Sequence, residues 1–342
     1  MILNSNVFGI DLGTGNIKIK SKNGKKALCE RNMIAIKDDE QILSIGDGAF
    51  SMFEKAPKNI EVSCPMVGGV IGSITNMEIL LYGLLKKLSK FGARGATFYM
   101  AVPTDVSEVE KRAFYAVVKS YTIRARKVWI VEKAIADAVY LGIDMTSQKG
   151  AMVVNIGADS TDISILCGGK IIISKTLKVG GKKLDEDICT IVRRRYNLRI
   201  GMTTAERLKN EMAYMYQERP KTMKVFGISI VAGIPKEMEI SSAVISEAIQ
   251  ETMEYISDTI SSIVERIPPE LIHDIMATGV YLTGGVSKIK NLANYFTMET
   301  GIKMNLCDDP ENSTILGLMD IMNHRDRQDY AYSTKDIAEH TR

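Results

Sequence analysis

The pattern of apolar and polar residues over the first 143 positions alternates between that of strands and that of helices. Residues 6–28 combine a buried strand, a glycine-rich turn and a returning strand, followed by Asn23-Gly24, a dipeptide typical of hairpin turns. Apolar residues spaced three and four apart predict a helix over 75–91. An uninterrupted apolar run predicts a buried strand at 96–103.

Strands and helices continue to alternate in the next segment. Residues 104–121 are expected to form a helix, with Thr104 or Ser107 as its N-cap and acidic residues in its first turn. Residues 126–143 are a short strand that runs into a helix. This order predicts an α/β fold with largely parallel or mixed sheets.

After Gly150 the pattern restarts with a strand, a glycine-containing turn and a second strand. Aligning Asn155 with Asp11, 144 positions earlier (155 − 11), also matches the apolar flanks of the two turns. Two such hairpins can match by chance, but the shared flanks favour an internal repeat of two α/β halves that present their turns to one cleft. The further matched pairs are Gly157 with Gly13, Ser160 with Asn16 and Thr161 with Ile17.

The remainder of the chain predicts helices around a small β segment. Apolar residues at three- and four-residue spacing give the helix at 246–267 one apolar face. A strand at 279–283 ends in a glycine turn that is expected to open another helix, and the polar stretch from 324 onward is expected to be a loosely ordered tail. The other expected elements are helices at 181–195 and 203–216 and a β segment at 223–241.

Composition narrows the class of protein without identifying it. A chain of 342 residues is long enough for two domains, and a net charge of +3 gives no argument for a nucleic-acid partner. No apolar run approaches the roughly 20 residues that span a bilayer. Five scattered cysteines without a CxxC pair indicate free thiols in a reducing cytosol, and three distant histidines disfavour a histidine metal site.

Two glycine-rich turns are candidates for binding phosphate. In DLGTGN, residues 11–16, glycines let backbone N–H groups approach an anion closely, and Asp11 at the strand end is placed to hold a Mg²⁺-bound water. Lys18 on the returning strand either reaches a phosphate or is a solvated strand lysine, with equal weight. The second turn lies within VVNIGADSTDIS, residues 153–164, and carries the hydroxyls of Ser160 and Thr161.

Two later motifs suit the nucleoside part of a nucleotide. Glu206 and Lys209 are three positions apart on one helix face, either to contact a ribose and an adenine edge or to form a surface ion pair. Spacing alone favours the surface pair. Gly284 and Gly285, between a strand and a helix start, either make room for a base or α-phosphate or form a simple tight turn.

The order of these motifs resembles that of the actin-like ATPase superfamily. GIDLGTGN, AVPTDVSEVEKRAF, RRRYNLRIGMTTAERLKNE and PPELIHDIMATGVYLTGGVSKIKNL are similar to the bacterial actin MreB/Mbl family from about residue 7 to about 320. The resemblance implies a duplicated, ribonuclease H-like actin fold whose two domains surround a cleft for ATP and Mg²⁺. The implied boundaries are domain I at 1–144 plus about 308–325, domain II at 145–307 with a small β subdomain at about 203–242, and a polar tail at 326–342.

The resemblance also assigns roles to individual positions. Asp11, Lys133, Asn155 and Thr161 fall at catalytic positions, with Asp11 holding Mg²⁺ through water. The implied nucleotide contacts are Gly13, Thr14, Gly15, Asn16 and Lys18, then Gly157, Ala158, Asp159 and Ser160, then Glu206, Arg207 and Lys209, and finally Gly284, Gly285, Val286 and Ser287.

The chain departs from the family at the positions expected near the γ-phosphate. Family members read DIGGGTTE where this chain reads NIGADSTD, so Asn155 replaces a carboxylate and Asp159 replaces a glycine. A carboxylate beside a triphosphate is repelled by about 4 kcal/mol at 4 Å for a near-surface dielectric. Lys133 stands where the family has the glutamate that positions the attacking water, and a protonated ammonium is no general base.

We therefore expect ATP hydrolysis to be weak or absent. Lys133 is expected to pair with Asp159, with a γ-phosphate or, one turn along the helix, with Asp137, while Glu132 points off the helix face that Lys133 occupies. Two other branches of the superfamily are alternatives. An actin-fold sugar kinase lacks an obvious catalytic carboxylate here, and a chaperone ATPase lacks a peptide-binding domain after residue 323.

The resemblance further implies self-association into filaments of paired protofilaments that lie under the cell membrane. Such filaments would work with the membrane-bound cell-wall synthesis machinery to set cell shape, in a cytoplasmic protein peripheral to the membrane. MILNSN is too short for an N-terminal amphipathic helix. Phe91, among the basic residues of 86–94, either contacts an anionic lipid surface or packs inward.

Overall fold

The computed structural model describes residues 6–89, 93–216 and 219–333. The chain separates into two compact units. Unit 1 comprises Met1–Gln148, Ser164–Thr176 and Glu311–Arg342, and unit 2 comprises Lys149–Ile163 and Leu177–Pro310. The domain boundaries expected from the sequence stay a prediction.

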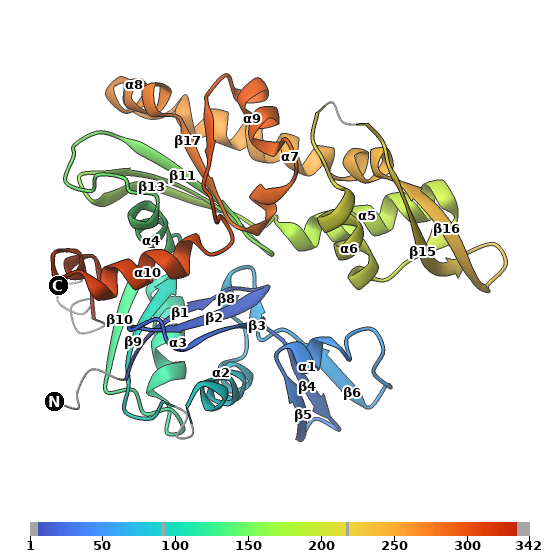
Figure 1. Ribbon diagram of the computed structural model, residues 1–342, viewed down its shortest axis with the longest axis horizontal. Coiled ribbons are helices and arrows are strands. Elements are labelled where there is room, and N and C mark those ends of the chain that lie inside the picture. Colours follow the sequence, from blue (N-terminus) through green and yellow to red (C-terminus); the bar gives the residue numbers. More distant parts are fainter. Residues whose placement is uncertain (1–5, 90–92, 217–218, 334–342) are drawn as a thin grey trace. The chain divides into compact units, whose positions relative to one another are not determined.

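Unit 1 is built around a five-stranded sheet (Figure 1). Two of its strand pairs are antiparallel, β1 with β2 and β2 with β3, and two are parallel, β1 with β9 and β9 with β10. The expected mixed sheet is thus confirmed. In sheet order the strands are β10 (Lys127–Glu132), β9 (Thr97–Val102), β1 (Val7–Leu12), β2 (Asn16–Ser21) and β3 (Ala27–Arg31).

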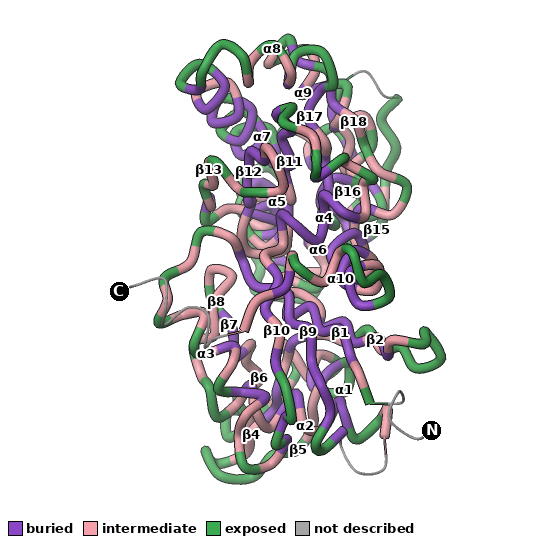
Figure 2. The backbone as a smooth tube through the Cα atoms, turned by 90° about the vertical axis from the view of Figure 1, so that its left-hand side faces the viewer, coloured by how far each residue is buried: buried purple, intermediate pink, exposed green. Residues whose placement is uncertain are grey.

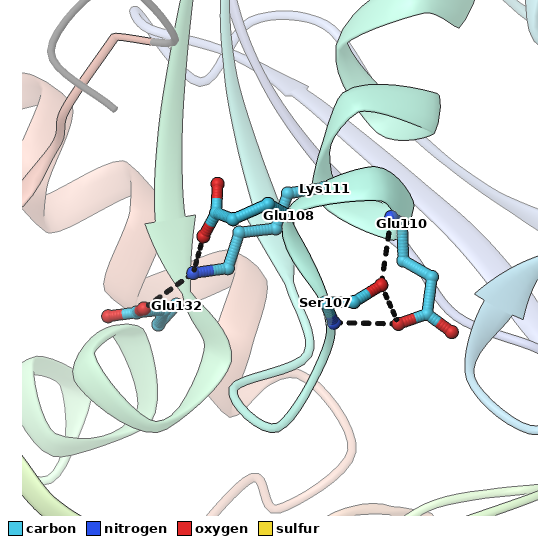
Figure 3. A network of polar contacts seen from close by, with 5 residues as sticks. All are labelled: Ser107, Glu108, Glu110, Lys111 and Glu132. Carbon is cyan, nitrogen blue, oxygen red and sulfur yellow. Dashed lines mark hydrogen bonds and ion pairs between the residues drawn. The ribbon is translucent and has the colours of Figure 1, made fainter. Parts of the chain in front are cut away.

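Helices of unit 1 begin where the sequence supplies capping groups. Ser107 caps α3 (Glu108–Lys119) in a capping box, since its hydroxyl accepts from the Glu110 N–H and its own N–H donates to the Glu110 carboxylate (Figure 3). Of the two expected caps, Ser107 is therefore the one used. Ser73 caps α2 (Ile74–Leu88) through its side chain alone, which accepts a hydrogen bond from the Asn76 N–H.

A smaller part of unit 1 was not predicted from the sequence. It contains a three-stranded sheet, a two-stranded hairpin and a short helix. These strands are only two to five residues long, and β5 and β6 contain no buried residue, so the apolar pattern does not reveal them. The elements are β4 (Ile34–Lys37), β5 (Gln41–Ile45), β6 (Ile60–Ser63), β7 (Met66–Val67), β8 (Val70–Ile71) and α1 (Asp47–Phe50).

A second five-stranded sheet repeats the order of the first. Counted from the antiparallel edge, the first sheet is β3-β2-β1-β9-β10 and the second is β13-β12-β11-β17-β18. In each, three strands consecutive in the chain are followed by two later, parallel strands. The duplicated α/β fold is confirmed. The second sheet comprises β11 (Ala151–Ile156), β12 (Thr161–Cys167), β13 (Lys170–Leu177), β17 (Val280–Thr283) and β18 (Met304–Leu306).

Burial follows this architecture. Figure 2 shows β1, β9 and β11 as runs of largely buried residues, and every residue of β9 is buried. In α7 (Ser242–Val264), the residues on the predicted apolar face, among them Ile249, Ile256 and Ile260, are fully buried. Strands β14 (Leu198–Arg199), β15 (Thr222–Ser229) and β16 (Pro235–Ser241) form the small β segment beside α5 (Gly181–Tyr196) and α6 (Met202–Met212).

The later part of the chain differs in detail from the expectation. The glycine turn after β17 opens the four-residue 3₁₀ helix η1 (Gly285–Lys288), and the following α-helix, α9, spans Leu292–Thr300. The tail is ordered as far as it is described, because η2 (Arg325–Tyr330) leads to Tyr332, which exchanges two backbone hydrogen bonds with Ile130. Burial raises the pKa of Tyr332 to about 12, with the Glu132 carboxylate adding to the effect.

The structure bears on membrane contact in two ways. None of the described helices has the length and apolar composition that a membrane crossing requires. Phe91, the residue expected to contact lipid, lies outside the described residues.

Two further helices complete the fold, α8 (Pro269–Thr278) and α10 (Ser313–Asn323).

Helices α4 (Lys133–Tyr140) and α10 pack so closely that Gly317 has no room for a side chain. A Cβ at that position would lie 1.8 Å from the Ala136 carbonyl oxygen. We predict that Gly317→Ala lowers the free energy of unfolding by about 3 kcal/mol, because the two backbones must separate. Chemical denaturation of the purified chain measures the change.

Gly83→Ala is the matched control in α2. There a Cβ would lie 2.2 Å from the Cδ1 atom and 3.6 Å from the Cγ1 atom of Ile45, a flexible side chain whose end can move aside. Its effect should be within about 1 kcal/mol, since alanine also favours the helix. Equal losses in the two variants would contradict the proposed packing constraint.

Candidate functional site

The first glycine turn, residues 13–16, is closed by one backbone hydrogen bond and supported from the side. The Gly13 N–H donates to the Asn16 carbonyl at 3.1 Å, and a Cβ on Gly13 would lie 2.6 Å from that oxygen. Asn32, fully buried, donates its side-chain amide to the Gly13 carbonyl and its backbone N–H to the Gly15 carbonyl. Sequence reasoning missed Asn32, because no local pattern marks it.

The second glycine turn is built in the same way. The Gly157 N–H donates to the Ser160 carbonyl at 2.8 Å, the hydrogen bond that the repeat alignment places opposite that of Gly13 and Asn16. A Cβ on Gly157 would lie 3.1 Å from the Ser160 oxygen. The two turns thus share their closing hydrogen bond as well as their place between paired strands, which chance similarity does not explain.

Asp11 and Lys133 form an ion pair within unit 1. Lys133 is the first residue of α4, and its Nζ lies 3.2 Å from Asp11 Oδ1. The side chains are only 16% and 10% exposed, respectively. Among the described residues this oxygen accepts no well-aligned hydrogen bond, so the ammonium charge is what compensates it. Sequence spacing gave no sign of a partner 122 positions away (133 − 11).

Glu132, which precedes Lys133, faces a different partner. Figure 3 shows Lys111 of α3 between two carboxylates, 3.4 Å from Glu108 and 3.5 Å from Glu132. Burial lowers the pKa of Lys111, but nearby Tyr332, Glu132 and Glu108 outweigh it, and the net shift is upward. Lys111 is therefore held in its charged form, and Glu132 is engaged in an ion pair.

Asp137 is fully buried and bonded within unit 1. Its Oδ1 accepts hydrogen bonds from Ser313 Oγ at 2.9 Å and Thr314 Oγ1 at 2.7 Å, both on α10. These contacts fasten α4 to α10 one turn beyond Lys133. The pairing of Lys133 with Asp137 or Asp159 stays a prediction.

Lys18 is buried rather than solvated, so the solvated alternative is wrong. It lies opposite Asp11 in the β1–β2 register, and its ammonium donates to the Glu311 backbone carbonyl. Lys18 and Lys133 thus bring two positive charges to the end of β1. Thr14, in the turn itself, is also nearly buried.

The second turn rests on the start of α5 in unit 2. The Gly181 and Lys182 N–H groups donate to the carbonyls of Gly157 and Ala158, at 2.9 and 2.7 Å. The Asp159 carboxylate lies 3.8 Å from the Lys182 ammonium, which offsets its charge. A Cβ on Gly180 would lie 2.6 Å from the Gly157 carbonyl oxygen, so the loop requires glycine there too.

Lys209 lies in the interior of unit 2. Its Nζ is 2.8 Å from Asp185 Oδ1 and donates to the Gly181 carbonyl, also at 2.8 Å. Since only 8% of the residue is exposed, the surface-pair interpretation is wrong. A Cβ on Gly181 would contact Lys209, Val286 and Ala158, so residues of three predicted motifs meet at this glycine.

The glycines after β17 also approach the second turn. Gly284 has a φ of +84°, and a Cβ there would lie 2.3 Å from the Ile156 carbonyl oxygen and 2.7 Å from Asn155 Oδ1. Its N–H donates to the Pro310 carbonyl at 2.7 Å. Unit 2 therefore gathers its predicted residues around one loop.

The hydroxyls of the remaining predicted residues have intrachain partners. Thr161 is fully buried and donates to the Val179 carbonyl at 2.8 Å, and Ser287 is fully buried and donates to the Thr283 carbonyl. On α6, Glu206 is half-buried and Arg207 is exposed. The roles of all these residues in binding or catalysis stay predictions.

The chain as a whole is similar to known cell-shape proteins. A family model described as MreB/Mbl protein matches residues 5–329. The cell shape-determining protein MreB of Escherichia coli strain K12 is 32% identical over 314 residues, which cover 90% of each chain. Mbl of Bacillus subtilis strain 168 is 29% identical over 323 residues, or 94% of this chain and 96% of its own.

Solved structures give the same result. MreB5 of Spiroplasma citri bound to ADP matches with a TM-score of 0.86 and 30% identity, over 92% of this chain and 94% of its own. MreB5 has also been solved bound to AMPPNP. The MamK double helical filament matches with a TM-score of 0.75 at 19% identity over 93% of this chain and 98% of its own, which shows the fold alone.

Lys209 gives a stability prediction for unit 2. We expect Lys209→Met to lower the free energy of unfolding by about 3 kcal/mol, because Asp185 would keep a buried charge without its partner. The double variant Asp185→Leu/Lys209→Met should recover most of that loss, since no charge is left buried. Denaturant unfolding without nucleotide measures both.

Lys183→Met is the matched control, because Lys183 pairs with Asp187 on the same helix at 47% exposure. Its expected effect is below about 0.5 kcal/mol. A Lys209→Met loss as small as that of the control would show that the buried pair does not stabilise the unit.

Proposed function

Since the chain belongs to the MreB/Mbl family of actin-like, cell-shape-determining proteins, we propose that it binds ATP and assembles into filaments of copies of itself. The observation that carries the nucleotide part is the pair of glycine turns with one closing hydrogen bond, Gly13 to Asn16 and Gly157 to Ser160. Turns of this kind expose backbone N–H groups to the phosphate oxygens of a nucleotide.

The adenosine part of the proposal rests on unit 2. Lys209, Gly181, Val286 and Ala158 meet beside the second turn, at the start of α5. S. citri MreB5, similar over most of the chain, has been solved with ADP and with AMPPNP. We keep Glu206, Arg207, Gly284 and Gly285 in the proposed contact set.

For Mg²⁺ the proposal is narrower than the resemblance implies. We retain the ion as one that the ATP phosphates themselves can carry, because Mg²⁺ in such sites is held largely by substrate phosphates and water. Asp11, its expected holder in the chain, is paired with Lys133 instead.

Weak hydrolysis is part of the proposed function. Lys133 stands where a glutamate is expected to position water, and its ammonium, which pairs with the Asp11 carboxylate, has no lone pair to accept a proton. The Thr161 hydroxyl donates to the Val179 carbonyl. Nucleotide binding, rather than turnover, is then the step that regulates assembly.

Membrane contact and the cell-wall synthesis machinery are proposed from family membership. The Phe91 segment remains the proposed contact with anionic lipid, in a cytoplasmic protein peripheral to the membrane. Lys86, five positions earlier in the chain, is exposed, and its ammonium lies 4.7 Å from the centre of the Tyr82 ring on α2. The proposed protein partners are other copies of this chain, assembled in paired protofilaments. The MamK double helical filament supports the fold of the subunit and not this arrangement.

Phosphate release tests the hydrolysis proposal. We expect a rate per filament at least about 100-fold below that of E. coli MreB under the same conditions, because a missing general base costs about that factor. The triple variant Lys133→Glu/Asn155→Asp/Asp159→Gly should raise the rate. A wild-type rate equal to that of E. coli MreB would refute weak hydrolysis.

Electron microscopy of the purified chain tests assembly. We expect paired straight filaments with ATP or a non-hydrolysable analogue. If no filament forms with any nucleotide while the folded chain still binds ATP, the chain is a nucleotide-binding protein of another kind.

A further inference from the structure

The charges at the first glycine turn differ from those that a protein-held Mg²⁺ requires. Mg²⁺ is bound by carboxylates together with substrate phosphates and water. Asp11 is the acidic residue at the end of β1, and a positive charge already lies 3.2 Å from its Oδ1. The residues present therefore do not fit the ion that the family implies.

We propose that the Lys133 ammonium takes the place of that ion, so that the chain binds ATP without requiring Mg²⁺. The inference rests on the proposed nucleotide function and names how the same site neutralises phosphate. Lys133 would act as a cation fixed to the start of α4, beside the phosphate turn at residues 13–16.

The local sum of charges supports this assignment. Asp11 contributes −1, while Lys133 and Lys18, which lies opposite Asp11 in the strand register, each contribute +1. These three side chains sum to +1 before any ion binds, and Glu311, whose backbone carbonyl accepts from Lys18, is a further acidic residue at this place. Glu132 does not change the sum, because Lys111 pairs with it.

Lysine at position 133 also replaces the charge of the metal in amount. A glutamate there would contribute −1 and the lysine contributes +1, a difference of two, which is the charge of one Mg²⁺. A Mg²⁺ placed at Asp11 would instead face the like charge of Lys133.

The geometry of Lys133 allows both contacts at once. An ammonium carries three N–H donors, and the pair with Asp11 orients the Lys133 side chain. The side chain is 16% exposed, so a phosphate oxygen can reach it while the pair is kept. A tethered cation held in this way needs no release or reloading when the nucleotide exchanges.

Calorimetric titration of ATP into the purified chain, with Mg²⁺ and separately with excess EDTA, tests the proposal. We expect the two Kd values of the wild type to agree within about threefold, or less than 1 kcal/mol. Lys133→Glu should lose at least about tenfold in EDTA and regain affinity with Mg²⁺, since a carboxylate pair then needs the metal. A wild type that binds only with Mg²⁺ would overturn the inference and leave the proposed function intact.

Two further variants separate the effect from misfolding and from net charge. Lys133→Met brings no second carboxylate to Asp11, and it should weaken ATP binding in EDTA by about tenfold. If it binds as tightly as the wild type, the ammonium does not neutralise phosphate and the inference fails. Lys25→Glu, at an exposed hairpin turn, changes the net charge by the same amount as Lys133→Glu. It should leave both Kd values unchanged.

A nucleotide-free measurement gives an independent result. Mg²⁺ alone should raise the melting temperature of Lys133→Glu, in which two carboxylates can share the ion, but not that of the wild type. A wild type stabilised by Mg²⁺ alone would show a resident metal site and overturn the inference. Absence of ATP binding in every condition would overturn the proposed function and this inference with it.

Discussion

Backbone packed directly against backbone is the constraint on which this structure depends. At Gly13 the missing side chain allows the Gly13 N–H to close the first turn on the Asn16 carbonyl. At Gly180 it allows α5 to start against the second turn. At Gly317 the same close approach joins α4 to α10. These contacts fix the loops and the start of α4 to which charged side chains are attached, so the placement of Lys133 follows from the packing of glycines elsewhere.

Charge is the second organising element, and in both units lysine carries it inward. Lys133 and Lys18 converge on the end of β1, and Lys209 is held between Asp185 and a backbone carbonyl. A buried ammonium is tolerated only where carboxylates or carbonyls surround it. The two lysines at the end of β1 therefore place positive charge where phosphate is proposed to bind, while Lys209 is held inside unit 2 beside the proposed adenosine contacts.

Local patterns in the sequence were sufficient for the elements and the repeat, and insufficient for the contacts between them. The alignment of Gly157 with Gly13 predicted two matching turns, and both turns close with the same backbone hydrogen bond, because turn geometry is set by neighbouring residues. The pair of Asp11 with Lys133 was not anticipated, since nothing in a chain marks which of many lysines a distant carboxylate will meet. The strands of residues 34–63 were missed because they are short and because β5 and β6 contain no buried residue.

The ordered segment after α10 has a consequence for how the chain can associate. β10 is an outer strand of the first sheet, and outer strands expose N–H and C=O groups that can recruit a strand of another molecule. Tyr332 uses the N–H and C=O of Ile130 for its own two hydrogen bonds, so part of this edge is already occupied. Fewer backbone groups of β10 are then open to pairing with a strand of another copy of the chain.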